Sequence, residues 1–108
     1  MNVYFRGFIS FDQGDEPPRH ERAEFLFPRE VPENDLEGVM YDVACITYDE
    51  HEVFDWITVV AYDATSNKPI VAIDFGRRYA TTKTTEFGPV WDPSRDYWHG
   101  EEIPDSLR

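Results

Sequence analysis

The sequence predicts a mainly β protein: a single small domain over residues 1–108, built on an antiparallel β-meander of about five to six strands with at most one short helix. The composition is 41% hydrophobic and 16% aromatic, which requires a folded core. Several short runs of β-branched and aromatic residues are separated by turn-forming residues. The single cysteine excludes an internal disulfide, and 108 residues suffice to fold without one.

Two strands are expected in the first third of the chain. Residues 2–11 are rich in β-branched and aromatic side chains, and residues 23–27 alternate apolar and polar side chains before Pro28. The intervening residues 12–22 combine a glycine, two prolines and several charges. We expect them to form a mobile loop.

Residues 32–47 fit two interpretations. Leu36, Met40, Val43 and Thr47 recur at helical spacing behind Pro32, yet the run from Val39 to Tyr48 is rich in strand formers and follows Gly38. We expect a short helical turn followed by a strand over about 39–48. The alternative is an α+β protein with a helix at about 32–47.

The remaining strands are expected at 53–63, 69–76 and 79–87, the last at a sheet edge. Residues 49–52 would turn the first hairpin and residues 64–67 the second. Residues 88–108 read as an irregular C-terminal tail that Trp91, Tyr97 and Trp98 pack onto the body.

Four-residue turns would place Tyr48 opposite Val53 and Asp63 opposite Lys68, and this register divides the side chains between two faces. The face predicted to form the core holds Tyr41, Val43, Cys45, Phe54, Trp56, Val60, Tyr62, Val71, Ile73 and Phe75. The opposite face would carry Asp42, Asp55 and Asp74, with Asp63 at its end.

Negative charge is concentrated in the middle of the chain. Between Arg29 and Lys68 stand ten carboxylates and no Lys or Arg, whereas each flank has a net charge of −1 within a total of −12. Such a local field attracts cationic partners and repels nucleic acid and anionic membranes. If the segment is a strand, carboxylates at alternate positions lie about 6.5 to 7 Å apart, close to the spacing of phosphates along a nucleic-acid strand. The plainer interpretation is that these acids only confer solubility.

No motif for catalysis, cofactor binding or metal binding stands out. His20, His51 and His99 lie apart, no glycine-rich phosphate loop is present, and no pattern identifies a family. Asp49, Glu50, His51 and Glu52 form the densest group of potential ligands, but a solvated turn explains them equally well. We therefore expect no catalytic residues, no cofactor and no metal. A lone cysteine and the lack of a signal-like or membrane-spanning run suggest a cytoplasmic location.

These observations favour a non-enzymatic acidic inhibitor that binds a basic, nucleic-acid-handling protein in the manner of a nucleic-acid mimic, with no direct contact to nucleic acid or membrane. Phage anti-CRISPR and anti-restriction proteins are analogues at the level of class. The alternatives are an immunity protein or antitoxin for a cationic toxin, and a small ligand-binding or accessory structural β-domain. Tyr48, Phe54, Trp91, Tyr97 and Trp98 are candidate aromatic anchors for the partner. The expected partner-binding residues are Glu33, Asp35, Glu37, Asp42, Tyr48, Asp49, Glu50, Glu52, Asp55, Asp63 and Asp74.

Overall fold

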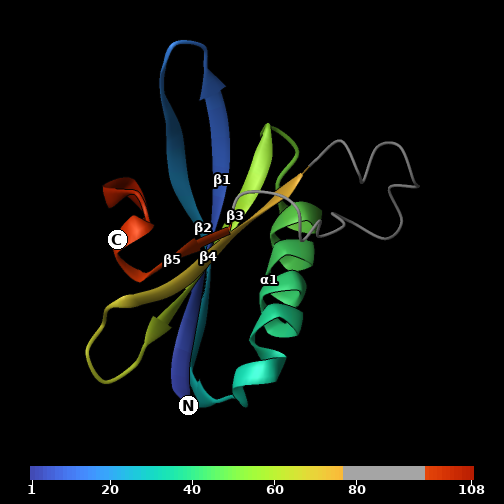
Figure 1. The fold of residues 1–108 in the computed structure, drawn as a ribbon. Coiled ribbons are helices and arrows are strands. Elements are labelled where there is room, and N and C mark those ends of the chain that lie inside the picture. Colours follow the sequence, from blue (N-terminus) through green and yellow to red (C-terminus); the bar gives the residue numbers. More distant parts are fainter. Residues whose placement is uncertain (77–96) are drawn as a thin grey trace.

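The computed structural model describes residues 1–76 and 97–108, and in them the predicted fold class is confirmed: an antiparallel β-sheet with one α-helix. The strands follow the order β2-β1-β3-β4-β5 across the sheet (Figure 1). Their bounds are Asn2–Gln13 (β1), Glu16–Glu30 (β2), Trp56–Asp63 (β3), Pro69–Gly76 (β4) and Tyr97–His99 (β5).

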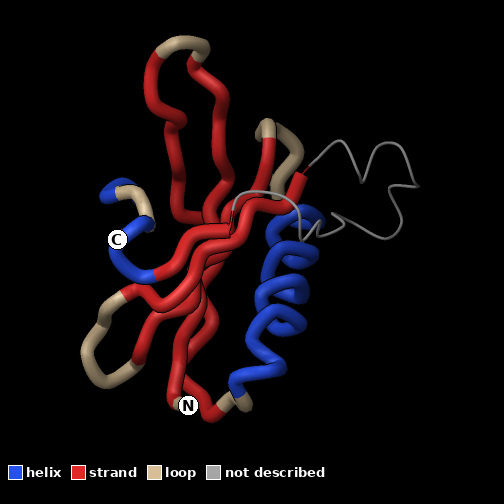
Figure 2. Tube along the Cα trace, in the orientation of Figure 1, coloured by secondary structure: helices blue, strands red, loops and turns tan. Residues whose placement is uncertain are grey.

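Helix α1 (Leu36–Glu50) follows the 3-10 turn η1 (Glu33–Asp35) and covers one face of the sheet. On the opposite face lie the 3-10 segments η3 (Gly100–Glu102) and η4 (Asp105–Leu107), shown in blue beside the C-terminus in Figure 2. The sheet is therefore covered by the helix on one side and partly by the C-terminal segment on the other.

The expected strand at 39–48, and with it the hairpin turn at 49–52, is wrong; the alternative of a helix in this region describes the structure better. Leu36, Met40, Val43, Ala44 and Thr47 are the buried residues of α1, and they recur every three or four positions along one side. Packing of this side on the sheet outweighs the weak preference of the β-branched residues for strands, because most helical stability comes from such tertiary contacts.

The expected loop over 12–22 is also wrong in most of its length. Strand β1 extends to Gln13 and β2 begins at Glu16, so that the two strands form a long hairpin whose pairing continues from Gln13–Glu16 to Asn2–Glu30. The register is irregular at three places along this hairpin; two of them coincide with the prolines of β2 (Pro17–Pro18 and Pro28), and the third lies at Ala23. The expected strand at 79–87 lies outside the described residues. Within the expected irregular tail, residues 97–99 instead form β5, which pairs with β4.

Strand β4 begins at Pro69 as predicted, and the turn at 64–67 is confirmed by the bond from the Asp63 N–H to the Lys68 carbonyl oxygen, 2.9 Å. However, Tyr62 pairs with Pro69 while Ala61 pairs with Val71, so Ile70 is an extra residue in β4. This β-bulge shifts the pairing of residues 71–76 with β3 by one position from the expected register. Because neighbouring residues of a strand point to opposite faces, each of these residues shares a face with a different set of β3 side chains than predicted.

The predicted division of faces is therefore wrong. Val71, Ile73 and Phe75 do point to the helix side, but there they meet Ile57, Val59 and Ala61 of β3. Val60 and Tyr62, predicted to join them, lie on the far side with Ala72. Residues of the helix-side core, all at most 8% exposed, are Val3, Phe5, Ile9, Val31, Leu36, Met40, Val43, Ala44, Phe54, Ile57, Val59, Ala61, Val71, Ile73 and Phe75.

Gly7 allows α1 to lie close to β1. A Cβ atom at this position would stand 2.6 Å from the Thr47 Oγ1, closer than packed atoms tolerate, and a tight 3.3 Å from the Val43 Cγ1. The absence of a side chain therefore sets how near the helix approaches the sheet.

Candidate functional site: the acidic surface of helix α1

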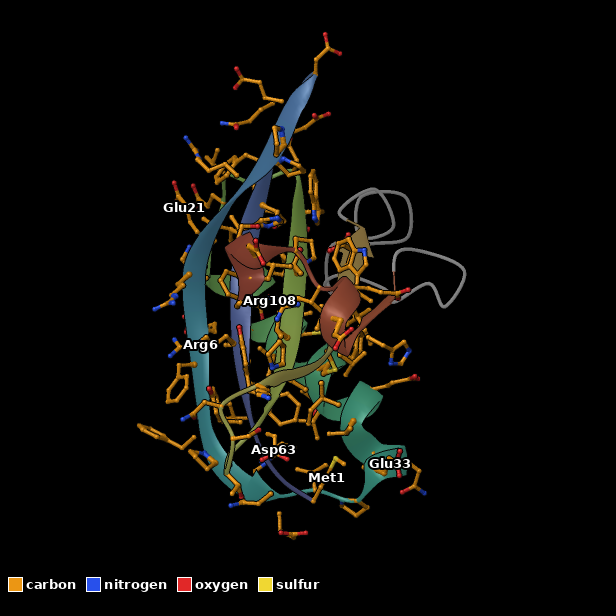
Figure 3. The ribbon with its side chains drawn as sticks, turned by 60° about the vertical axis from the view of Figure 1, so that its left-hand side comes forward. Met1, Arg6, Glu21, Glu33, Asp63 and Arg108 are labelled. Atoms are coloured by element: carbon orange, nitrogen blue, oxygen red, sulfur yellow. The ribbon has the colours of Figure 1, made fainter. Side chains whose placement is uncertain are left out.

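Because α1 packs one side on the sheet, the carboxylates on its other side face solvent. Asp35, Asp42 and Asp49 are exposed and follow one another at intervals of seven residues, which is close to two helical turns. Glu33 is exposed in the preceding turn and lies toward the same end of the molecule as Met1 and Asp63 (Figure 3). We call Glu33, Asp35, Asp42 and Asp49 the acidic helix surface.

The spacing of these carboxylates differs from the expectation. Positions seven apart on a helix lie about 10.5 Å apart along its axis, rather than the 6.5 to 7 Å of alternate positions on a strand. The phosphate-like spacing inferred for Asp42 and its neighbours is therefore wrong, because it depended on a strand that is a helix.

The acidic helix surface has no cationic partner among the described residues. Ion pairs within residues 1–76 and 97–108 join the Met1 amino group to Glu30 at 2.7 Å, Arg19 to Glu21 at 3.4 Å and Arg108 to Asp105 at 3.4 Å. None of these reaches Glu33, Asp35, Asp42 or Asp49. The negative charge of this surface is therefore not neutralised locally by the described part of the chain.

Cys45 lies on the same side of the helix between two of these acids. Burial is the main cause that raises the pKa of its thiol, and the negative charges of Asp42 and Asp49 raise it further, against a hydrogen bond with Tyr41 that lowers it. The thiol is therefore protonated at neutral pH, so Cys45 is a poor nucleophile.

The other expected partner-binding residues of this region lie at the margins of the surface. Glu37 is half-buried beside a hollow of about 330 Å³ that Ile70, Val71 and His99 also line. Glu52 is exposed in the connection between α1 and β3. Tyr48 is half-buried with its ring edge-on to Phe54, 5.7 Å between centroids.

The aromatic anchors expected from the sequence are not free surface groups where they are described. Phe54 is only 3% exposed and belongs to the helix-side core. Trp98 is half-buried and packs against the cluster on the far side of the sheet. Trp91 and the Tyr97 side chain lie outside the described residues.

Asp55 and Asp63 have structural partners. The Asp55 carboxylate accepts a hydrogen bond from the Asp12 N–H at 2.7 Å, which fastens the connection after α1 to β1. The Asp63 carboxylate accepts from the N–H groups of Thr65 and Ser66 at 2.8 and 3.1 Å. These bonds lower the pKa of Asp63 and stabilise the turn before β4.

Asp74 does not join the acidic helix surface. It lies on the opposite face of the sheet and is 3% exposed, with its carboxylate accepting a hydrogen bond from the Thr58 hydroxyl at 2.6 Å. A residue so deeply buried cannot offer its charge to a protein partner. It lies opposite to Val71, Ile73 and Phe75 as predicted, but that face of the sheet is buried rather than open to a partner.

A row of buried polar side chains leads away from Asp74. Thr58 accepts a hydrogen bond from the Trp56 indole N–H at 3.1 Å and contacts the Ser10 hydroxyl at 3.1 Å, and Ser10 in turn contacts the His20 Nδ1 at 2.6 Å. Ser10 and Thr58 are fully buried. No buried side-chain nitrogen or oxygen among the described residues lacks a partner. This row is a satisfied polar network, in keeping with the high cost of burying an unpaired group.

The direction of the network fixes the tautomer of His20. Each hydroxyl carries one hydrogen, so Thr58, which donates to Asp74, must accept from Ser10. Ser10 has then no hydrogen left for His20, and the His20 Nδ1–H must donate to the Ser10 oxygen. Burial lowers the pKa of His20, which favours this neutral form.

Sequence reasoning missed one cluster at the end of α1. Glu24 of β2 lies beside Glu50 and His51, and the potential ligand atoms of all three lie within 4.8 Å of one another. A hydrogen bond with Glu50 is the main cause that raises the pKa of Glu24 to about 7, with burial and the charge of Glu50 adding to it. Glu50 and His51 were recognised as potential ligands, but Glu24 is far away in sequence and only the β2–α1 packing brings it near.

No protein-family model matches this chain, and no curated protein or solved structure is detectably similar to it. Among the described residues, no helix combines the length and the apolar character that crossing a membrane requires. The residues and their geometry are therefore the basis for assigning a function.

Proposed function

We propose that this protein is a non-enzymatic inhibitor in which the acidic helix surface docks on a basic, nucleic-acid-handling surface of another protein. The observation that carries this proposal is the set of exposed carboxylates at Glu33, Asp35, Asp42 and Asp49, which form no ion pair with any described residue. Carboxylates left without partners repel one another, and a cationic partner would relieve that repulsion.

The proposed mechanism is electrostatic and steric exclusion. A helix that presents negative charge along its outer side steers a basic surface toward itself and then occupies the space that nucleic acid would take. Each exposed ion pair contributes only about 0.2 to 1 kcal/mol, so binding would depend on many such contacts. The cytoplasm, where nucleic-acid-handling proteins are abundant, is the proposed location.

The proposal is tested by capture of partner proteins on immobilised wild-type protein and on two variants of equal charge change. The first carries Asp35→Asn, Asp42→Asn and Asp49→Asn; the second carries Asp15→Asn, Glu16→Gln and Glu101→Gln, which are exposed outside α1. We expect basic nucleic-acid-binding proteins on the wild type and on the second variant, but not on the first. Raising the salt concentration from about 0.05 to 0.5 M should release them.

The kinetics of the captured partner sharpen the test. The first variant should associate about 10-fold more slowly than the wild type, with a smaller change in dissociation, since charge outside a buried contact acts mainly on encounter. Equal losses in both variants would mean that the overall charge of −12, rather than the helix, attracts the partner. Capture of no basic protein by the wild type would contradict the proposal.

A further inference from the structure

Three potential metal ligands from distant parts of the chain meet where β2 passes the C-terminal end of α1. Glu24 comes from β2, Glu50 is the last residue of the helix and His51 is its C-cap. One carboxylate oxygen from each glutamate and one imidazole nitrogen lie within 4.8 Å of one another. We propose that Glu24, Glu50 and His51 bind a divalent transition-metal ion, and that Zn²⁺ is the ion that fits them best. This inference does not depend on the proposed function.

The donor set favours zinc over the hard cations. Zinc sites with an open position commonly have three protein ligands from imidazole and carboxylate groups, with water as the fourth. Zn–N and Zn–O bonds of about 2.0 to 2.2 Å imply that ligand atoms around a tetrahedral ion lie about 3.4 Å apart. Ca²⁺ and Mg²⁺ prefer shells made wholly of oxygen with six or more ligands, so the imidazole discriminates against them.

The side chains can close from the observed separation to that distance. Glu50 is exposed and already hydrogen-bonded to Glu24, so the two carboxylates lie together. The His51 backbone is fixed to the helix by the hydrogen bond from its N–H to the Thr47 carbonyl oxygen, 3.2 Å. A hollow of about 210 Å³, lined by Tyr48, His51, Glu52 and Phe54, adjoins the imidazole. Water can therefore reach the vicinity of His51.

The local electrostatics favour a cation at this place. The C-terminal end of a helix is the negative end of its dipole, and the last turn of α1 contains no basic residue. Glu50 therefore stands where a negative charge is unfavourable, and Glu24 adds a second carboxylate beside it. No described Lys or Arg forms an ion pair with either glutamate. A divalent ion would neutralise both carboxylates at once.

The test is calorimetric titration of the full chain with Zn²⁺ at about pH 8, because ligation needs deprotonated imidazole and carboxylate groups and is favoured by higher pH. We expect one equivalent to bind to the wild type. Glu24→Gln, Glu50→Gln and His51→Gln should each weaken binding by more than about 10-fold, since even the loss of a group that supports a ligand costs about 10- to 100-fold. Absorption of bound Co²⁺ should report the same loss, and circular dichroism checks that each variant is folded.

Two matched variants separate this site from adventitious binding. Asp49→Asn removes an exposed carboxylate next to Glu50 in sequence, and His99→Asn removes an exposed imidazole in β5. Both should bind Zn²⁺ as the wild type does. The proposal is overturned if the wild type binds no stoichiometric Zn²⁺, if the three ligand variants bind it unchanged, or if Ca²⁺ binds as tightly as Zn²⁺.

Discussion

The carboxylates on the two sides of the sheet differ in burial and in hydrogen bonding. On the far side, Asp74 is 3% exposed and takes part in a hydrogen-bonded row with Thr58, Ser10 and His20. On the helix side, Asp42 and its neighbours stand on the outer surface of α1 without an ion pair to any described residue. One group of acids is held by the fold, and the other is left available to solvent.

This difference teaches how to separate structural from functional acids in a strongly acidic chain. Net charge alone counts Asp74, Asp63 and Asp42 alike. Asp74 and Asp63, however, accept hydrogen bonds that stabilise a strand pair and a turn. Only acids without such internal partners remain as candidates for binding another molecule, and among the expected residues these gather on α1.

The largest expected effect is a loss of folding stability when a side chain is removed from the core between the sheet and α1, compared with the same change at an exposed position of the sheet. Phe5→Ala should lower the free energy of unfolding by about 3 to 5 kcal/mol, because Phe5 is fully buried between the sheet and α1. Phe27→Ala is the matched control, since Phe27 is 75% exposed on the neighbouring strand. Urea unfolding measures both. A large loss for Phe27→Ala would mean that this ring is covered in solution.

A second substitution tests the buried hydrogen-bonded row on the far side of the sheet. Thr58→Val should lower the free energy of unfolding by about 1 to 3 kcal/mol, because it preserves the shape but deprives the Asp74 carboxylate and the Trp56 indole of a partner. Thr65→Val, in the exposed turn before β4, should stay within about 0.5 kcal/mol of the wild type. Urea unfolding of both variants checks this. Similar small effects would show that the row contributes little stability.

The smallest expected effect is a pH dependence of folding stability that comes from Glu24, beside the C-terminal end of α1. The pKa of Glu24 is about 7 in the folded protein and near its ordinary 4.5 when unfolded, so the folded state holds an extra proton between these values. Stability due to Glu24 should therefore be greatest below about pH 4.5, fall as pH rises to about 7 and stay low above it. Urea midpoints across this range, compared between wild type and Glu24→Gln, measure the contribution.

The comparison with Glu24→Gln is needed because other groups titrate in the same range. The lowered pKa of His20 acts in the opposite direction: stability is lost as pH falls below about 6.5 and the unfolded chain takes up the proton first. Glu24→Gln should remove only the fall in stability at rising pH, and Glu16→Gln, an exposed control on the same strand, should leave it in place. An unchanged profile in Glu24→Gln would mean that the two glutamates do not share a proton.

The parts of the fold that local signals determine could be predicted from the sequence. Strand β4 is marked by the mainly apolar run from Pro69 to Gly76, and the turn at 64–67 by its small and polar residues. The sequence predicts both within the right bounds. The sequence favours a strand over about 39–48 and leaves a helix at about 32–47 as the alternative, because Val39, Val43 and Ile46 prefer strands. The contacts that decide for helix α1 come from the sheet, which is formed by other parts of the chain.

The candidate site shows the same limit. The excess of acids between residues 30 and 67 was visible from composition, and most of the acids predicted to bind do lie on or beside α1. What could not be predicted was which of them the fold would engage. The bulge at Ile70 places Asp74 among buried hydroxyls, and the passage of β2 beside α1 brings Glu24 to Glu50. Both depend on pairing between segments that are remote in sequence.

The bulge at Ile70 also determines how this chain tolerates changes in length. Removing Ile70 would restore regular pairing with β3 and leave Val71, Ile73 and Phe75 opposite Ala61, Val59 and Ile57 on the helix side, at the cost of the Ile70 contacts with the core. Removing a residue within Val71–Phe75 would instead turn the side chains on one side of the deletion to the other face of the sheet. Adding or removing a residue among the exposed positions Thr65, Ser66 and Asn67 would alter only the turn that joins the strands. Natural or designed insertions and deletions in this hairpin should therefore accumulate in the turn or at the bulge and avoid the residues from Val71 to Phe75.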